Sequence, residues 1–104
     1  MTYAPLGPTH QAIDDFALMR SIPNMRIFAP ADPRECRSIL QYLCRSTFPA
    51  YVRIARGGEP NFLGALSDLD PGKGRYVFQG EEIAVLSTGS ISFECFTAVK
   101  GLRE

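Results

Sequence analysis

The first half of the chain alternates between helix-like and strand-like patterns of apolar residues. Residues 10–21 carry apolar side chains at helical spacing, and Thr9 in front of them is a suitable N-cap. Residues 25–30 and 50–55 form short stretches rich in β-branched or aromatic side chains, which is typical of strands. Apolar residues on both faces of 50–55 favour a buried parallel strand.

The strongest helix pattern covers residues 33–46. Asp32 can cap this helix, Pro33 suits its first position, and Glu35 completes a capping-box arrangement. Apolar side chains then recur at helical spacing, at Cys36, Ile39, Leu40 and Leu43. The order helix, strand, helix, strand predicts an α/β fold.

The second half of the chain changes character. Gly, Pro and Asp are frequent in 59–75, which predicts a linker. A short strand before Gly80, a strand over Ile83–Ser87 and a helix over 91–103 are expected after it. We therefore expect a partial three-layer α/β sheet of mostly parallel strands, followed by the beginning of a second α/β domain. The predicted division is 1–58, 59–75 and 76–104.

Composition excludes several classes of partner. Hydrophobic residues make up 45% and charged residues 21% of the chain, and eleven basic residues balance eleven acidic ones. This neutral balance offers no electrostatic attraction for nucleic acid or anionic membranes. Residues 1–20 lack the pattern of a signal peptide, and no apolar run is long enough to span a membrane, so we expect a cytoplasmic protein. The cysteines, which fit no zinc motif and are expected as reduced thiols, are Cys36, Cys44 and Cys95.

Two residues are candidates for chemistry. His10, the only histidine, follows Gly7-Pro8 and could act as a general base, although a solvated residue near a helix start is the simpler interpretation. Arg56 follows the second predicted strand, where it is either solvated or a ligand-binding cation.

Other combinations have a structural interpretation that we favour. Asp14 and Asp15 could form a carboxylate pair, but adjacent residues point to different helix faces, so a solvated helix start is expected. Cys36 could pair with His10 as nucleophile and base, yet it lies on the apolar helix face. The glycines that match no phosphate-binding motif are Gly57, Gly58, Gly72 and Gly74.

Three stretches of the sequence resemble the transketolase family. GPTHQAIDDFALMRSIPNMRIFAPADPREC, residues 7–36, is most similar to the split form, in which a separate C-terminal subunit carries the pyrimidine-binding domain. AYVRIARGG, residues 50–58, resembles the next strand of that domain. GKGRYVFQGEEIAVLSTGS, residues 72–90, resembles the junction at which the family's C-terminal domain begins. The combination of GPTHQ, RSIPNM and PAD is specific, although each motif alone would be weak.

The resemblance implies a function. Transketolases transfer two-carbon ketol units between sugar phosphates with thiamine diphosphate and a divalent metal, Mg²⁺. By resemblance, His10 would hydrogen-bond substrate oxygens and Arg56 would contact the sugar phosphate, which suits the planar fork of a guanidinium. The implied partners are a diphosphate-binding subunit or domain, a sugar phosphate, and a second protomer in a dimeric assembly.

Other parts of the family's site have no counterpart in this sequence. The catalytic glutamate and the aromatic residues on the pyrimidine are expected upstream of residues 7–11, and the glycine-aspartate motif for metal and diphosphate belongs to another domain. Leu6 stands where family members often carry an acidic residue that contacts a substrate hydroxyl. We therefore expect a fragment or subunit that contributes substrate-binding residues and is inactive alone, without measurable cofactor affinity.

Three alternatives stay open. The chain could be a non-catalytic interaction subunit that completes a partner. It could be similar to deoxyxylulose phosphate synthases, which share GPTH and IPNM, although Gln11 favours transketolase. It could also be an unrelated small α/β protein that binds a phosphorylated ligand at His10 and Arg56.

Overall fold

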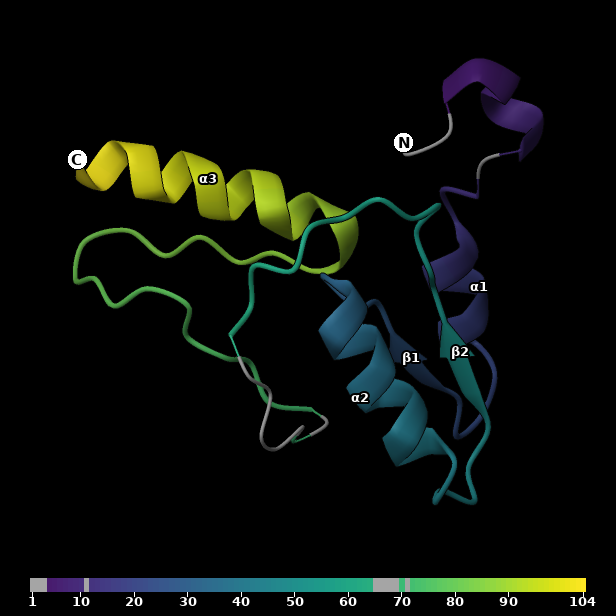
Figure 1. Ribbon diagram of the computed structural model, residues 1–104. Coiled ribbons are helices and arrows are strands. Elements are labelled where there is room, and N and C mark those ends of the chain that lie inside the picture. The colour runs from purple at the N-terminus through teal and green to yellow at the C-terminus, as the bar shows by residue number, and fades with distance from the viewer. Residues whose placement is uncertain (1–3, 11, 65–69, 71) are drawn as a thin grey trace.

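The computed structural model of the 104-residue chain describes residues 4–10, 12–64, 70 and 72–104 (Figure 1). No helix in these ranges combines the length and the apolar character needed to cross a membrane. In chain order, the elements are the 3₁₀ helix η1 (Ala4–His10), α1 (Asp15–Arg20), β1 (Arg26–Phe28), α2 (Pro33–Leu43), β2 (Ala50–Val52), the 3₁₀ helix η2 (Gly89–Ile91) and α3 (Ser92–Arg103).

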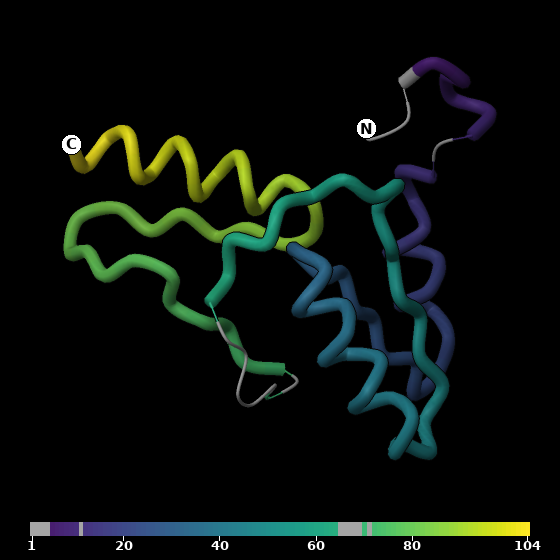
Figure 2. The backbone as a smooth tube through the Cα atoms, viewed as in Figure 1, coloured from purple at the N-terminus to yellow at the C-terminus, as the bar shows by residue number. Residues whose placement is uncertain are grey.

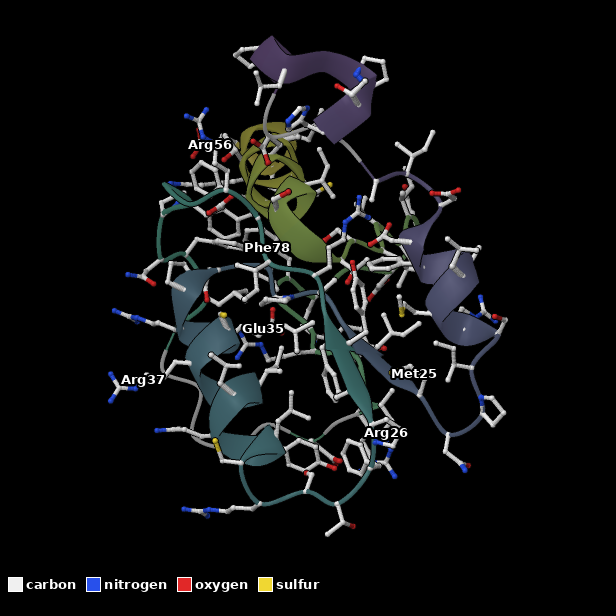
Figure 3. The ribbon with its side chains drawn as sticks, turned by 90° about the vertical axis from the view of Figure 1, so that its right-hand side faces the viewer. Met25, Arg26, Glu35, Arg37, Arg56 and Phe78 are labelled. Atoms are coloured by element: carbon white, nitrogen blue, oxygen red, sulfur yellow. The ribbon has the colours of Figure 1, made fainter. Side chains whose placement is uncertain are left out.

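Strands β1 and β2 form a two-stranded parallel sheet. Arg26 lies beside Ala50 and Phe28 beside Val52, and α2 connects the two strands along the chain. Helices α1 and α2 lie on opposite sides of the strand pair (Figures 1 and 3). The predicted partial α/β fold with parallel strands is therefore confirmed.

The N-terminus of α2 forms the predicted capping box and makes a further contact. Asp32 Oδ1 accepts a hydrogen bond from Glu35 N at 2.8 Å, and Glu35 Oε2 accepts one from Ala31 N at 2.6 Å. The second oxygen of Asp32 accepts bonds from the backbone of Leu63, at 3.1 Å, and Phe62, at 3.3 Å. The buried Asp32 carboxylate thus attaches the chain after β2 to the beginning of α2.

Aromatic rings connect α3 to this attachment point. The Phe62 ring centroid lies 5.6 Å from that of Phe93 and 5.2 Å from that of Phe96, both on α3. Phe78 stacks on Phe96 at 5.1 Å, and the Arg103 guanidinium lies over the Phe78 ring. Rings of this separation attract one another beyond their area burial, so they fix α3 against residues 62 and 78.

A second aromatic group packs α2 against β1. Tyr42 lies between Phe28 and Phe48, with centroid separations of 6.3 Å and 5.9 Å. Arg26 donates a hydrogen bond to the Tyr42 hydroxyl at 3.1 Å, and its guanidinium carbon lies 3.8 Å from the centroid of the Phe48 ring. This group lies at the end of the strand pair where β1 and β2 begin.

The first α-helix is shorter than the predicted 10–21. It begins at Asp15, and the Ala12 carbonyl accepts a hydrogen bond from Arg53 Nη2 at 2.8 Å. In a longer helix this carbonyl would accept a bond from Phe16 N–H. The predicted start at residue 10 was wrong, because residues 12–14 lie outside the helix, where a side chain 41 positions away binds the Ala12 carbonyl.

The prediction that Thr9 caps this helix was also wrong. Thr9 lies inside η1, where its hydroxyl donates to the Leu6 carbonyl at 3.3 Å. Gly7 interrupts η1 with φ 63° and ψ −163°, a conformation that only glycine adopts readily. The Gly7-Pro8 pair therefore makes a separate turn before α1.

The strands predicted before Gly80 and over Ile83–Ser87 are not formed. The described residues 72–88 make a long loop that turns back and returns to α3 at Gly89 (Figure 2). Ile83 is 82% and Leu86 95% exposed. A strand needs a neighbouring strand for its ladder, and no described residue supplies one to this segment. The predicted helix over 91–103 is confirmed as α3.

The predicted linker 59–75 falls partly outside the described residues, at 65–69 and 71. Its described part contains no helix or strand, but the backbone at 62–63 is bonded to α2. The division into 1–58, 59–75 and 76–104 stays a prediction.

We expect Asp32→Ala to lower the free energy of unfolding by about 2 kcal/mol or more, because it removes an N-cap and leaves the Leu63 backbone N–H without its acceptor. Urea unfolding followed by circular dichroism measures this loss. Asp14→Ala is the matched control, since Asp14 precedes α1 without a side-chain capping bond. Equal losses in the two variants would contradict the role of Asp32.

Candidate functional site

Because β1 and β2 run parallel, both strands end at the same edge of the sheet, which we call the carboxyl edge. Helix η1 and the segment after β2, residues 53–56, lie at this end of the molecule (Figures 1 and 3). Gly89 N donates to Ala29 O at 3.0 Å, so the first residue of η2 lies in space beside the residue that follows β1. Ligands of parallel sheets bind outside the carboxyl ends of the strands, and we take this edge as the candidate site.

His10 ends η1 and is exposed. Its Nδ1 lies 3.0 Å from the hydroxyl oxygen of Thr9, whose single hydrogen is directed to the Leu6 carbonyl. In the tautomer with its hydrogen on Nδ1, the ring donates to Thr9 and Nε2 is an acceptor. The ring can then accept a hydrogen bond from a ligand hydroxyl at Nε2.

Arg56 lies four residues after the end of β2 and is exposed. Figure 3 shows it at the same end of the molecule as η1. Gly57 and Gly58 follow with φ of 108° and 94°, so the chain turns immediately after the arginine through conformations that favour glycine. Arg56 and the helix η1, which ends at His10, therefore lie at the same end of the molecule.

Helix α1 begins with a buried carboxylate that the sequence did not indicate. Asp15 is only 6% exposed, whereas Asp14 beside it is exposed. The expectation that both aspartates begin a solvated helix was wrong for Asp15. Its Oδ2 accepts a hydrogen bond from the Tyr51 hydroxyl at 2.8 Å and lies 3.5 Å from Arg53 Nε.

Arg53 joins this carboxylate to the segment after His10. Its Nη2 donates to the Ala12 carbonyl at 2.8 Å, and its guanidinium carbon lies 4.8 Å from the centroid of the Phe16 ring. The side chain is 44% exposed, so the ion pair with Asp15 is partly screened by solvent. We call Asp15, Tyr51 and Arg53 the β2 clamp, because together they attach the chain before α1 to β2.

The β2 clamp changes the titration of Tyr51. The hydrogen bond to Asp15, with smaller contributions from burial and from the negative charge of Asp15, raises the pKa of Tyr51 above its usual value, while the Arg53 charge opposes the shift. A neutral phenol donates to the carboxylate, whereas a phenolate would repel it. The neutral form is therefore the one that holds Asp15.

One signal in the sequence could have indicated the clamp. Tyr51 and Arg53 are two positions apart in a predicted strand, so their side chains lie on the same face. Local patterns cannot supply the third member, because Asp15 lies 36 positions before Tyr51.

The remaining candidate chemistry consists of the cysteines and one surface depression. Cys36, Cys44 and Cys95 are free thiols. Within the described ranges, no three His, Cys, Asp or Glu side chains form a group that could hold a metal ion. An open depression lies beside α3, lined by Phe62, Leu63, Gly64, Arg75, Tyr76, Val77 and Phe96. Neither His10 nor Arg56 lines this depression.

Comparison with known proteins gives one family. The sequence model described as "Transketolase, pyrimidine binding domain" matches residues 1–59. The sequence is 35% identical over 103 residues to one subunit of the apulose-4-phosphate transketolase of Actinobacillus succinogenes, and the match covers 99% of this chain and 33% of that protein. No solved structure matches.

Synthases are matched as well. The 1-deoxy-D-xylulose-5-phosphate synthase of Vibrio parahaemolyticus is 41% identical over 103 residues, covering 93% of this chain and 16% of the synthase. The Shewanella sediminis synthase is 39% identical over 100 residues, covering 92% and 16%. The chain thus spans a third or less of the relatives described here, and both kinds of relative match it.

The raised pKa of Tyr51 makes stability depend on pH in the alkaline range. The hydrogen bond to Asp15 stabilises the fold fully below the unfolded tyrosine pKa of about 10 and is lost as pH rises through the higher folded pKa. We expect Tyr51→Phe to be less stable than the wild type at about pH 8 and to lack this part of the alkaline loss. Urea unfolding between about pH 8 and pH 11.5 measures both effects.

Tyr76→Phe is the control for this titration, because Tyr76 is 81% exposed. It should follow the wild-type dependence on pH. If Tyr51→Phe lost stability with pH as steeply as the wild type, the assignment of the bond to Tyr51 would be wrong.

Proposed function

Because this chain belongs to the family of transketolase pyrimidine-binding domains, we propose that it contributes substrate-binding residues to a thiamine-diphosphate enzyme. The enzyme would transfer two-carbon ketol units between sugar phosphates. The chain spans 33% of the apulose-4-phosphate transketolase polypeptide that it matches, so the activity of a whole enzyme is a proposal for this chain.

The observation that supports the proposal is that Arg56 and η1, which ends at His10, lie at the same end of the molecule. An imidazole with an acceptor nitrogen suits a sugar hydroxyl, and a guanidinium suits a phosphate through paired N–H donors. One residue would orient the sugar and the other would bind its phosphate. Holding both ends of a substrate in this way lowers the entropic cost of reaching a reactive geometry.

The residues of the described part do not fit a metal–diphosphate site, since no three potential ligands lie together there. We therefore assign no residue of this part to the metal or the diphosphate. Thiamine diphosphate and Mg²⁺ would be held by a diphosphate-binding subunit or domain. We propose a dimeric, cytoplasmic assembly in which this chain supplies one wall of the site.

Two alternatives have their own support. Identities of 39% and 41% to 1-deoxy-D-xylulose-5-phosphate synthases favour a synthase-like reaction, which would use the same sugar-phosphate contacts. The exposed side chains of Ile83, Leu86 and Leu102 favour a non-catalytic subunit that covers a partner. Sedimentation of the purified chain tests the second alternative. An interaction subunit would be stable only with a larger partner, so a stable monomer would argue against it.

We expect ribose 5-phosphate to bind the purified chain weakly, with a Kd of about 1 mM or above, and to shift the NMR signal of the His10 ring. Arg56→Gln should weaken binding about tenfold by removing the phosphate contact. Arg37→Gln is the control, since Arg37 lies on α2 and points away from the strand pair (Figure 3). Equal affinities for ribose 5-phosphate in both variants would overturn the role of Arg56.

We also expect no ketol transfer by the purified chain alone with thiamine diphosphate, Mg²⁺ and sugar phosphates. The described residues offer no group of three side chains that could hold a metal ion. A coupled assay for the sugar-phosphate product measures this, with a complete transketolase as positive control. Turnover by the chain alone would refute the proposal that a partner holds the cofactor.

A further inference from the structure

Arg53 contacts three different groups around the beginning of α1. Its Nη2 donates to the Ala12 carbonyl at 2.8 Å, its Nε lies 3.5 Å from Asp15 Oδ2, and its guanidinium carbon lies 4.8 Å from the centroid of the Phe16 ring. The Tyr51 hydroxyl donates to the same carboxylate oxygen at 2.8 Å, which fixes Asp15 in turn. The Ala12 carbonyl, the Asp15 carboxylate and the Phe16 ring thus together orient the guanidinium.

The carbonyl that Arg53 binds lies two residues after His10. Two residues of chain span at most about 7 Å, so fixing the Ala12 carbonyl restricts where the imidazole can lie. In a longer α1, the same carbonyl would accept Phe16 N–H, and His10 would follow the helix. The bond from Arg53 therefore holds this carbonyl in its observed position before the short α1.

We propose that Arg53 is a positioning residue that holds His10 at the carboxyl edge relative to Arg56. This inference rests on the proposed function, in which His10 contacts a sugar oxygen and Arg56 the phosphate. Arg53 and Arg56 are three positions apart after β2, so one short segment places both contacts. A lysine would not replace Arg53, because a single ammonium lacks the planar fork that serves a carbonyl, a carboxylate and a ring together.

His10 is the only histidine of the chain, so a ¹³C-labelled imidazole gives one Cε1–H signal that reports on this residue alone. We expect Arg53→Gln to shift and sharpen this signal as the ring loses its fixed surroundings. The Cα shifts of residues 12–14 should move towards helical values, and affinity for ribose 5-phosphate should fall about tenfold. Arg53→Lys should resemble Arg53→Gln in all three measurements.

Arg26→Gln is a closely matched control. Arg26 also donates to a polar group, the Tyr42 hydroxyl at 3.1 Å, and also lies over a ring, that of Phe48. It lies at the opposite end of the strand pair from η1 (Figure 3). Its loss should lower the melting temperature as the loss of Arg53 does, while the His10 signal and the affinity for ribose 5-phosphate stay at wild-type values.

The outcomes distinguish the positioning role of Arg53 from the proposed binding of a sugar phosphate. An unchanged His10 signal in Arg53→Gln, or an equal shift in Arg26→Gln, would overturn the positioning role. If the wild type did not bind ribose 5-phosphate while Arg53→Gln alone shifted the His10 signal, the proposed function would fail and the positioning of His10 would stand. A shift in Arg53→Gln alone, with weakened binding, supports both.

Discussion

The carboxylate of Asp32 accepts backbone hydrogen bonds from two parts of the chain that are about thirty positions apart. One oxygen caps α2, and the other holds the chain at residues 62 and 63. Leu63 becomes buried as a result, and the neighbouring Phe62 is placed against the two phenylalanines of α3. Few side chains are buried in the described part, namely Ala31, Ile39 and Leu63 among the hydrophobic ones. A small core of this kind depends on a polar contact that fixes several segments at once.

The sequence predicts what short spacings determine. The capping box at Asp32 and Glu35 follows from neighbouring residues, and the structure contains it. The strands predicted over 25–30 and 50–55 are also present, as the shorter β1 and β2. The roles of His10 and Arg56 come from the resemblance of GPTHQ and AYVRIARGG to the family and stay a prediction. Contacts between distant positions were not predictable, because periodicity carries no information about them.

Two of these distant contacts involve the residues at which the predictions for α1 and for Asp15 were wrong. The bond from Arg53 holds the Ala12 carbonyl before the short α1, and the bond from Tyr51 contacts a buried carboxylate that local patterns place in solvent. The stretch at Ile83–Ser87 has strand-like composition, yet the described residues provide no strand for it to join. A strand forms only beside a second strand, so the sequence of one segment is not sufficient to predict it.

The same buried carboxylate carries an energetic cost. Asp15 Oδ1 is buried without a hydrogen-bond partner among the described residues, which costs about 1–3 kcal/mol. A replacement that removed both the carboxylate and its partners could be nearly neutral for stability. Asp15 therefore contributes more to where Arg53 points than to how stable the fold is.

The extended segment at residues 83–87 has a consequence for the newly synthesised chain. Its apolar side chains lie in solvent, and short stretches of this composition pair readily with copies of themselves. Glu81 and Glu82 directly precede it, and their like charges oppose stacking of identical chains. Self-association grows with concentration, whereas folding of a single chain does not. Folding and self-association therefore compete for the new chain. Dilution, or rapid coverage of residues 83–87, favours folding.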